Sequence, residues 1–226
     1  MMTAEDFFLA DYQHVSLMEY PGKISSIAFT HGCNLRCRYC HNPALVAGRK
    51  GSNRLPEFLK YLEGKDIEAV ALTGGEPLLA CDVAGFLRVI KGRGLAVKLD
   101  TNGFLPDRLE KVLSAGLVDY VAVDLKAFND ADLKAIARTN HKLDSFFKTV
   151  NVLKASGVPF EVRHTIWKML EEADVASVAE YAGDAPLFVQ TIRDVRMLDK
   201  SYKPEIFDRQ AAVRLLEKYF KDVRVR

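Results

Sequence analysis

Short apolar runs alternate with amphipathic helical patterns along most of the chain, and this alternation limits the folds open to it. Runs such as VAVDL at residues 121–125 are apolar but for one aspartate and do not alternate with polar residues, as in strands buried on both faces. Strand and helix in alternation predict a parallel sheet covered by helices. We expect strands over residues 24–30, 68–72, 96–100, 120–125, 160–165 and 187–190, with a short one over 223–225. Helices are expected over residues 54–63, 82–92, 106–115, 130–137, 144–155, 170–181 and 204–219.

The number of strand–helix repeats sets the size of the barrel. A complete eight-stranded barrel needs about 250 residues, whereas this chain has 226 residues and six repeats. The prediction is therefore an α/β fold with parallel strands, a partial (β/α)6 TIM-like barrel. We expect one domain over residues 1–226, with its core over 14–190 and a C-terminal loop and helix over 191–226. In such folds the chemistry gathers at the carboxyl ends of the strands.

Composition limits the classes of partner and the cellular compartment that we expect for this protein. The 32 Lys and Arg residues nearly balance 30 Asp and Glu residues, so charge gives no argument for nucleic acid or a membrane as main partner. The N-terminus carries acids before any apolar stretch and does not resemble a signal peptide. No apolar run approaches the roughly 20 residues that cross a bilayer. We expect a soluble, cytoplasmic protein, in which clustered cysteines indicate metal binding rather than disulfides.

Three cysteines follow the first predicted parallel strand. Cys33, Cys37 and Cys40 form a C-x3-C-x2-C pattern. Thiolates are the soft ligands of iron–sulfur clusters. A closed [4Fe–4S] centre takes four cysteines, so three leave one iron open to a substrate, as at other catalytic metals.

Zinc is the alternative at this loop. The three cysteines with His31 or His41 would complete a Cys3His structural site, although such sites usually have a second pair of ligands that is lacking here. Cys81, before a predicted helix, is a candidate fourth ligand. A lone cysteine is more often a small buried residue, and we expect burial for Cys81.

The cysteine pattern, with Tyr39 before its last member, resembles the radical S-adenosylmethionine superfamily. The segment TGGEP at residues 73–77 ends the second predicted strand and resembles that superfamily's glycine-rich segment. The resemblance implies a [4Fe–4S] cluster on the three cysteines. It also implies reductive cleavage of S-adenosylmethionine to methionine and a 5′-deoxyadenosyl radical. Gly74, Gly75 and Glu76 would meet the methionyl amino group, and Tyr39 and Asn42 would lie near adenine, although Tyr39 is equally explained as a core aromatic.

Further polar residues fall at the predicted strand ends. Asp100 closes the third strand, Asp124 and Lys126 lie on one face at the fourth, and Arg163 lies in the fifth. Solvated strand ends and helix caps are the simple explanation. Their concentration at one rim favours a site in which Asp100 with Lys126 orients the methionyl end and Arg163 binds its carboxylate or the ribose. Asp100 and Asp124 are also a candidate pair of cation ligands.

Within the superfamily, the chain resembles the activating enzymes of glycyl radical enzymes. The segments SLMEYPGKI at 16–24, CHNP at 40–43, DTNG at 100–103 and DLK at 124–126 resemble activating proteins of anaerobic ribonucleoside-triphosphate reductase. The implied substrate is a glycine of that reductase's large subunit. The implied electron donor is of the flavodoxin or ferredoxin type.

The resemblance covers residues 14–165 well and the remainder poorly. Pyruvate formate-lyase activators carry a histidine near the sixth strand, where this chain has Gln190 or Arg193 as the candidate replacement. An activase of another glycyl radical enzyme, such as pyruvate formate-lyase, therefore stays open. So does a small-molecule enzyme such as 7-carboxy-7-deazaguanine synthase, and, outside enzymes, an electron-transfer or zinc-binding module. The charged segment 193–203 is a candidate docking or lid loop, and the simpler expectation is a solvated linker.

Overall fold

The computed structural model describes residues 7–47, 51–192 and 197–226, which form two compact units. The first unit contains residues up to Asn34, then Asn42–Thr101 and Asp107–Val121. The second contains Leu35–His41, Asn102–Pro106 and Ala122–Arg226. The single domain expected over residues 1–226 stays a prediction.

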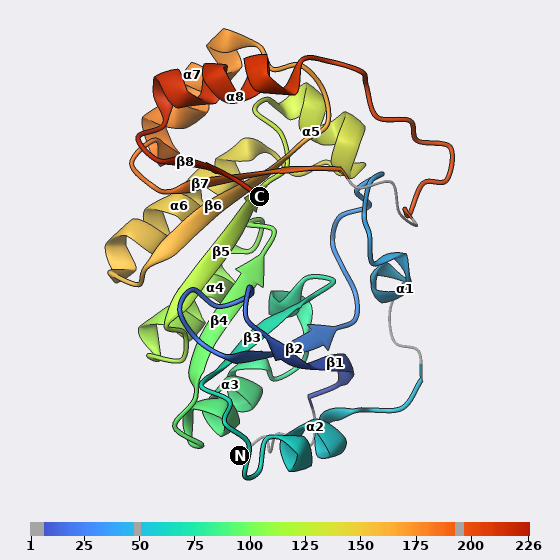
Figure 1. Cartoon of the computed structure of the whole chain (residues 1–226), viewed down its shortest axis with the longest axis vertical. Helices are drawn as coiled ribbons and strands as arrows, with labels where there is room; N and C mark the ends of the chain where they lie inside the picture. Colours follow the sequence, from blue (N-terminus) through green and yellow to red (C-terminus); the bar gives the residue numbers. More distant parts are fainter. Residues whose placement is uncertain (1–6, 48–50, 193–196) are drawn as a thin grey trace. The chain divides into compact units, whose positions relative to one another are not determined.

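The first unit carries a mixed sheet whose strands are neighbours in chain order (Figure 1). The first two strands pair antiparallel, and the second, third and fourth are parallel. These strands are β1 (Leu9–Ser16), β2 (Ser25–Thr30), β3 (Ala69–Gly74) and β4 (Ala96–Thr101). The helices are α1 (Pro43–Val46), α2 (Leu55–Tyr61), α3 (Val83–Lys91) and α4 (Pro106–Ser114), with a 3-10 turn η2 (Pro77–Leu79).

Aromatic side chains fill much of the core of the first unit. Phe7 stacks on Phe86 of α3 with ring centroids 4.3 Å apart, and Phe58 of α2 lies 6.5 Å from Phe86. All three side chains are fully buried. Large buried rings of this kind contribute strongly to stability because each removes extensive apolar surface from water. The packing attaches α2 and α3 to the segment that leads into β1.

The second unit contains the strands that come later in the chain, and these are parallel. Strand β5 (Tyr120–Leu125) begins in the first unit and continues into the second. Strands β6 (Phe160–Ile166), β7 (Leu187–Thr191) and β8 (Val223–Val225) pair in parallel. The helices of this unit are α5 (Asp130–Ala137), α6 (Leu143–Ser156), α7 (Glu172–Ala182) and α8 (Arg209–Tyr219). Helix α6 buries Phe146, Val150 and Leu153.

The predicted parallel α/β architecture is confirmed by these pairings, whereas some elements differ from expectation. Strand β1 and the short helix α1 were not predicted. In β1 only Leu9 is buried, so the sequence lacks the apolar alternation that marks a half-buried strand. Helix α8 starts later than predicted because the Asp208 side chain accepts hydrogen bonds from the Gln210 and Ala211 amides and caps it there. Among the described residues, no helix has the length and apolar character needed to span a membrane.

Candidate active site

The loop after β2 carries the three cysteines of the predicted cluster motif. All three are thiols rather than half-cystines, with Cys37 buried and Cys33 and Cys40 half-buried. The Cys40 amide donates to the Cys37 carbonyl at 3.0 Å, so these two thiols lie on one tight turn. Three thiols in one loop fit the soft donor set of an iron–sulfur cluster. Among the described residues, no three or more Cys, His, Asp or Glu side chains are grouped so that they could hold a single metal ion.

Cys81 lies on the surface, and the expectation that it is buried is wrong. It occupies the turn between η2 and α3, just before the cap of that helix. The next residue, Asp82, has a left-handed backbone (φ +46°) and accepts a hydrogen bond from the Gly85 amide at 3.0 Å. The turn into the cap leaves the thiol exposed. A role as fourth cluster ligand stays untested.

Two glycines let the end of β3 approach the backbone that leads into the cysteine loop. Gly74 has φ +123°, and a Cβ added to it would lie 2.3 Å from the Thr30 nitrogen. A Cβ on Gly75 would lie 1.9 Å from the Gly32 carbonyl oxygen. The Glu76 amide donates to that same oxygen at 2.7 Å, and the Gly75 amide donates to the Thr30 carbonyl at 3.0 Å. The neighbouring backbone leaves no room for a side chain, so glycine is required at both positions. Gly32, whose carbonyl oxygen forms part of this close contact, was not among the predicted site residues.

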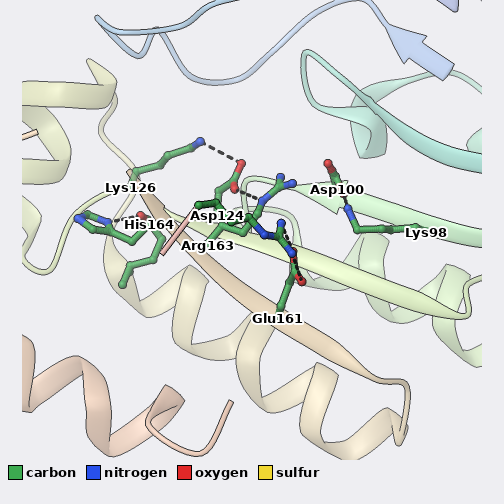
Figure 2. A network of polar contacts seen from close by, with 9 residues as sticks. Lys98, Asp100, Asp124, Lys126, Glu161, Arg163 and His164 are labelled. Atoms are coloured by element: carbon green, nitrogen blue, oxygen red, sulfur yellow. Dashed lines mark hydrogen bonds and ion pairs between the residues drawn. The ribbon is translucent and has the colours of Figure 1, made fainter. Parts of the chain in front are cut away.

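Buried polar contacts follow at the ends of β3 and β4. The Glu76 side chain is fully buried, and its Oε1 accepts hydrogen bonds from the Leu78 amide at 3.1 Å and the Thr101 hydroxyl at 2.9 Å. Lys98 and Asp100, two residues apart on β4, form a buried ion pair (Figure 2). Lys98 was not predicted as a site residue. Its signal was a lysine inside an otherwise apolar strand, two residues before an aspartate.

In the second unit, Asp124 accepts hydrogen bonds from two cations. Its Oδ1 lies 2.8 Å from Arg163 Nε, and its Oδ2 lies 3.0 Å from Lys126 Nζ (Figure 2). Burial alone would raise the pKa of the Asp124 carboxyl, but the charges of Arg163 and Lys126 hold that pKa well below its ordinary value. Burial opposes the charge of Lys126, yet Asp124 raises the pKa of the ammonium well above normal. All three groups are charged at neutral pH.

The structure thus brings Asp124, Lys126 and Arg163 together, in agreement with the predicted shared face of Asp124 and Lys126. Asp100 belongs to the first unit, where its ion-pair partner is Lys98. The joint role predicted for Asp100 with Lys126, and the cation site predicted for Asp100 with Asp124, stay predictions. Both oxygens of Asp124 already contact protein cations.

Tyr39 and Asn42, the two residues expected near adenine, differ in exposure. Tyr39 is buried in the second unit, and this burial raises the pKa of its phenol far above normal, so the hydroxyl stays neutral. Lys126 and Thr165 are among its neighbours there. Asn42 is exposed and precedes α1, and its side chain makes no capping hydrogen bond. Burial agrees with Tyr39 as a core aromatic, and the cofactor role of either residue stays a prediction.

His164 is a buried titratable group that the sequence reasoning did not select. Its Nδ1 lies 2.8 Å from the Leu125 carbonyl oxygen, and its ring meets Phe128 edge-on at 4.8 Å. Burial lowers the pKa of His164 to about 4, so the imidazole is neutral at physiological pH. Because β6 alternates its faces, His164 is directed away from its neighbour Arg163 (Figure 2). Gln190, the candidate replacement for the activators' histidine, lies in β7 one residue before its end, and Arg193 lies outside the described residues.

Comparison with known proteins agrees with this fold and identifies a family. The family model of the Radical SAM superfamily matches residues 27–182. The chain is 29% identical over 222 residues to "Putative glycyl-radical enzyme activating enzyme MJ1227" of Methanocaldococcus jannaschii, covering 94% of this chain and 92% of that protein. It is 31% identical over 170 residues to the pyruvate formate-lyase-activating enzyme of Clostridium pasteurianum, covering 71% of this chain and 69% of that protein.

Solved structures give the same fold class. Streptococcus suis SuiB bound to S-adenosylmethionine matches with a TM-score of 0.69 and 13% identity, over 88% of this chain and 49% of SuiB. A domain of a pyruvate-formate lyase-activating enzyme from Bacteroides vulgatus matches with a TM-score of 0.51 and 16% identity, over 70% of this chain and 98% of that domain. The chain therefore spans about half the length of SuiB. The predicted fold class, a parallel-stranded partial barrel, is confirmed.

The family model covers more than half of the chain, so the match defines a class of enzyme that depends on an iron–sulfur cluster. The chain belongs to the radical SAM superfamily, whose members use a [4Fe–4S] cluster and S-adenosylmethionine.

Proposed function

We propose that Cys33, Cys37 and Cys40 hold the [4Fe–4S] cluster and leave one iron for S-adenosylmethionine. A reduced cluster held by these thiols would supply one electron to the sulfonium, so that a C–S bond of S-adenosylmethionine would break to give methionine and a 5′-deoxyadenosyl radical. The observation that carries this proposal is the C-x3-C-x2-C set of thiols in the loop at the carboxyl end of β2. The close crossing of the Gly74–Glu76 backbone with Thr30 and Gly32 supports it, because it brings the β3 end beside the start of that loop.

The segment 74–76 is proposed to contact the methionyl amino group of S-adenosylmethionine. The Glu76 side chain already accepts hydrogen bonds from Leu78 and Thr101, so backbone carbonyl oxygens are the acceptors we expect an ammonium group to find. A side chain at Gly74 or Gly75 would obstruct this approach as well as the backbone crossing.

The charged side chains are assigned to the other groups of the same ligand. Asp124, Lys126 and Arg163 together carry two positive charges and one negative charge, and the net positive charge suits the methionyl carboxylate. Asp100 is proposed to orient the methionyl end together with Lys126, and Tyr39 and Asn42 to lie near adenine. The cation hypothesis for Asp100 and Asp124 is tested by exchanging monovalent and divalent salts. Unchanged binding of S-adenosylmethionine would refute it.

We infer that the radical's target is a glycine of a glycyl radical enzyme. The α-carbon of glycine carries no side chain, so a hydrogen there is accessible to a radical held in a protein site. The similarity to MJ1227 over nearly the whole chain and to the pyruvate formate-lyase activator supports this class of target. The segment SLMEYPGKI at 16–24 favours the large subunit of anaerobic ribonucleoside-triphosphate reductase as partner. Electrons would come from a flavodoxin- or ferredoxin-type donor.

Two other substrates are retained because particular similarities favour them. Pyruvate formate-lyase is the alternative glycyl radical partner, on the strength of the activator from Clostridium pasteurianum. A small molecule is the second, because the 7-carboxy-7-deazaguanine synthase of Methanothermobacter thermautotrophicus is 35% identical over 143 residues, 56% of this chain and 55% of that enzyme.

Anaerobic reconstitution with iron and sulfide, followed by reduction, tests the chemistry. The protein is expected to form 5′-deoxyadenosine from S-adenosylmethionine, and Cys37→Ala is expected to abolish this product because one cluster ligand is lost. Cys81→Ala is the matched control, because Cys81 is an exposed thiol outside the loop and its loss should leave the rate unchanged. An unaltered rate in Cys37→Ala would refute the assignment.

The partner is identified by incubating the active protein with each candidate in turn. A glycine-centred radical signal on the anaerobic reductase, with none on pyruvate formate-lyase, supports the favoured partner, and the reverse supports the alternative. Turnover of the deazaguanine precursor with no signal on either protein would overturn the activase proposal.

A further inference from the structure

The turn that carries Cys37 and Cys40 is anchored on one side by helix α5. The Arg36 amide donates to the Ala137 carbonyl at 2.8 Å, and the Arg38 amide donates to the Ile136 carbonyl at 2.9 Å. The last carbonyl groups of a helix have no donor within the helix. The amides of the cysteine loop therefore supply the hydrogen-bond donors that the last carbonyl groups of α5 lack.

A segment from the far end of the chain anchors the other side of the same turn. We name residues 197–202 the clasp segment. The Leu198 amide donates to the Cys40 carbonyl at 3.0 Å, and the Asp199 amide donates to the Arg38 carbonyl at 3.1 Å. The expectation of a solvated linker over residues 193–203 is therefore wrong for this part. Residues 193–196 lie outside the described residues.

The Asp199 carboxylate links the clasp segment to two cations. Its Oδ2 accepts hydrogen bonds from Arg38 Nε at 3.0 Å and from an Arg138 guanidinium nitrogen at 2.6 Å. Its Oδ1 accepts hydrogen bonds from the Ser201 amide at 3.0 Å and the Ser201 hydroxyl at 2.6 Å. Only 8% of the Asp199 side chain is exposed. Both oxygens are fully used, so this carboxylate is built into the fold and is not a chance surface pair.

Arg38 is held by a second contact from the same segment. Its guanidinium lies 4.8 Å from the centre of the Tyr202 ring, and Tyr202 is buried. An arginine that combines a carboxylate contact with an aromatic face has little rotational freedom left. Because Arg38 lies between Cys37 and Cys40 in the sequence, fixing its backbone and side chain also fixes the turn that carries both thiols.

We propose that the clasp segment holds the Cys37–Cys40 turn in the conformation that binds the cluster, with Asp199 as its positioning residue. The inference deepens the proposed function and depends on it for the identity of the bound group. A turn held before the cluster arrives loses less conformational entropy on binding, which increases affinity and slows release. Asp199 contacts neither the cluster nor the reacting atoms in this account and acts through Arg38 and the loop backbone.

The test compares Asp199→Asn with Asp222→Asn. Asp222 is a matched control, because it also pairs with an arginine, Arg224, but on the exposed surface away from the cysteine loop. The first readout is hydrogen–deuterium exchange in the cluster-free chain. We expect amides of residues 36–40 to exchange about tenfold faster or more in Asp199→Asn, the ratio that matches the loss of one charge-assisted hydrogen bond. Exchange equal to that of Asp222→Asn would overturn the proposal.

The second readout is the release of iron to a chelator from the reconstituted holoprotein, which we expect to be faster in Asp199→Asn only. Arg138→Gln is the additional variant. It removes one of the two cations that contact the Asp199 carboxylate, while Arg38 and the sequence of the cysteine loop stay intact. It should accelerate loop exchange in the same direction and by a smaller factor, whereas no change would count against Asp199 as the link. If the chain bound zinc instead of an iron–sulfur cluster, the exchange result would persist while 5′-deoxyadenosine would not form, so the two proposals fail separately.

Discussion

Replacing Gly75 by alanine tests whether the close approach of β3 to the start of the cysteine loop holds the first unit together. The added Cβ would lie 1.9 Å from the Gly32 carbonyl oxygen, far inside the contact distance. The new Cβ would meet the Gly32 carbonyl oxygen, which also accepts a hydrogen bond from the Glu76 amide. This oxygen belongs to the backbone, so it cannot rotate away as the end of a side chain would. Either the strand end or the loop has to move.

The cost can be worked out against a control glycine. Overpacking a tight site costs about 1–3 kcal/mol, and the upper end applies because backbone meets the new atom. Gly64→Ala meets no atom within 4 Å but has φ +66°. It should cost only about 1 kcal/mol, the left-handed strain of roughly 1–2 kcal/mol less the entropy gain in the unfolded chain. Gly74→Ala combines a 2.3 Å contact with φ +123° and should cost about 4 kcal/mol.

Urea unfolding of the cluster-free protein, followed by circular dichroism, measures these differences. With a slope near 3 kcal/mol per molar urea, as expected for a chain of this size, Gly75→Ala should lower the midpoint by about 1 M and Gly64→Ala by about 0.3 M. A midpoint for Gly75→Ala no lower than that of Gly64→Ala would refute the close backbone crossing.

Two further predictions concern buried titratable side chains. The pKa of His164 falls from an ordinary 6.5 to about 4 on folding, so the unfolded chain binds a proton first as pH drops, and stability should decline by about 3 kcal/mol between pH 6.5 and 4. In His164→Asn this part of the pH dependence of urea unfolding should vanish, and an unchanged slope would contradict the assignment. Lys98→Met removes the partner of buried Asp100 and should destabilise the chain by about 3 kcal/mol, while Lys98→Met with Asp100→Leu should recover most of the loss. If the double variant is as unstable as the single one, the ion pair is not the cause.

The parallel strands were predictable because strands buried on both faces are rich in apolar residues, although β4 and β6 also carry charged side chains. The predicted strand over 120–125 coincides with β5, and β3, β4 and β6 differ from expectation by one or two residues. Strand β1 was not predictable in this way, because a mostly exposed strand at the edge of a sheet carries no apolar pattern.

The site was predictable in its motifs and not in its contacts. The cysteine spacing and the Gly-Gly-Glu segment are local in sequence, so reading the chain identifies them. The partners of the charged residues are set by strand register and burial: Asp100 has Lys98, and Asp124 has both Arg163 and Lys126. The contacts of the clasp segment could not be predicted for a further reason. Arg38 and Asp199 are 161 residues apart, and the charge of the segment 193–203 does not indicate which residue it contacts.

We propose above that three cysteines hold a cluster with one iron left for S-adenosylmethionine. The decisive experiment is electron paramagnetic resonance of the reduced, anaerobically reconstituted protein. A [4Fe–4S] spectrum whose shape changes when S-adenosylmethionine is added is the predicted result, and it should be lost in Cys37→Ala and kept in Cys81→Ala. A cluster spectrum that S-adenosylmethionine leaves unchanged, or a chain that retains only zinc, would show that no iron is left open for this ligand.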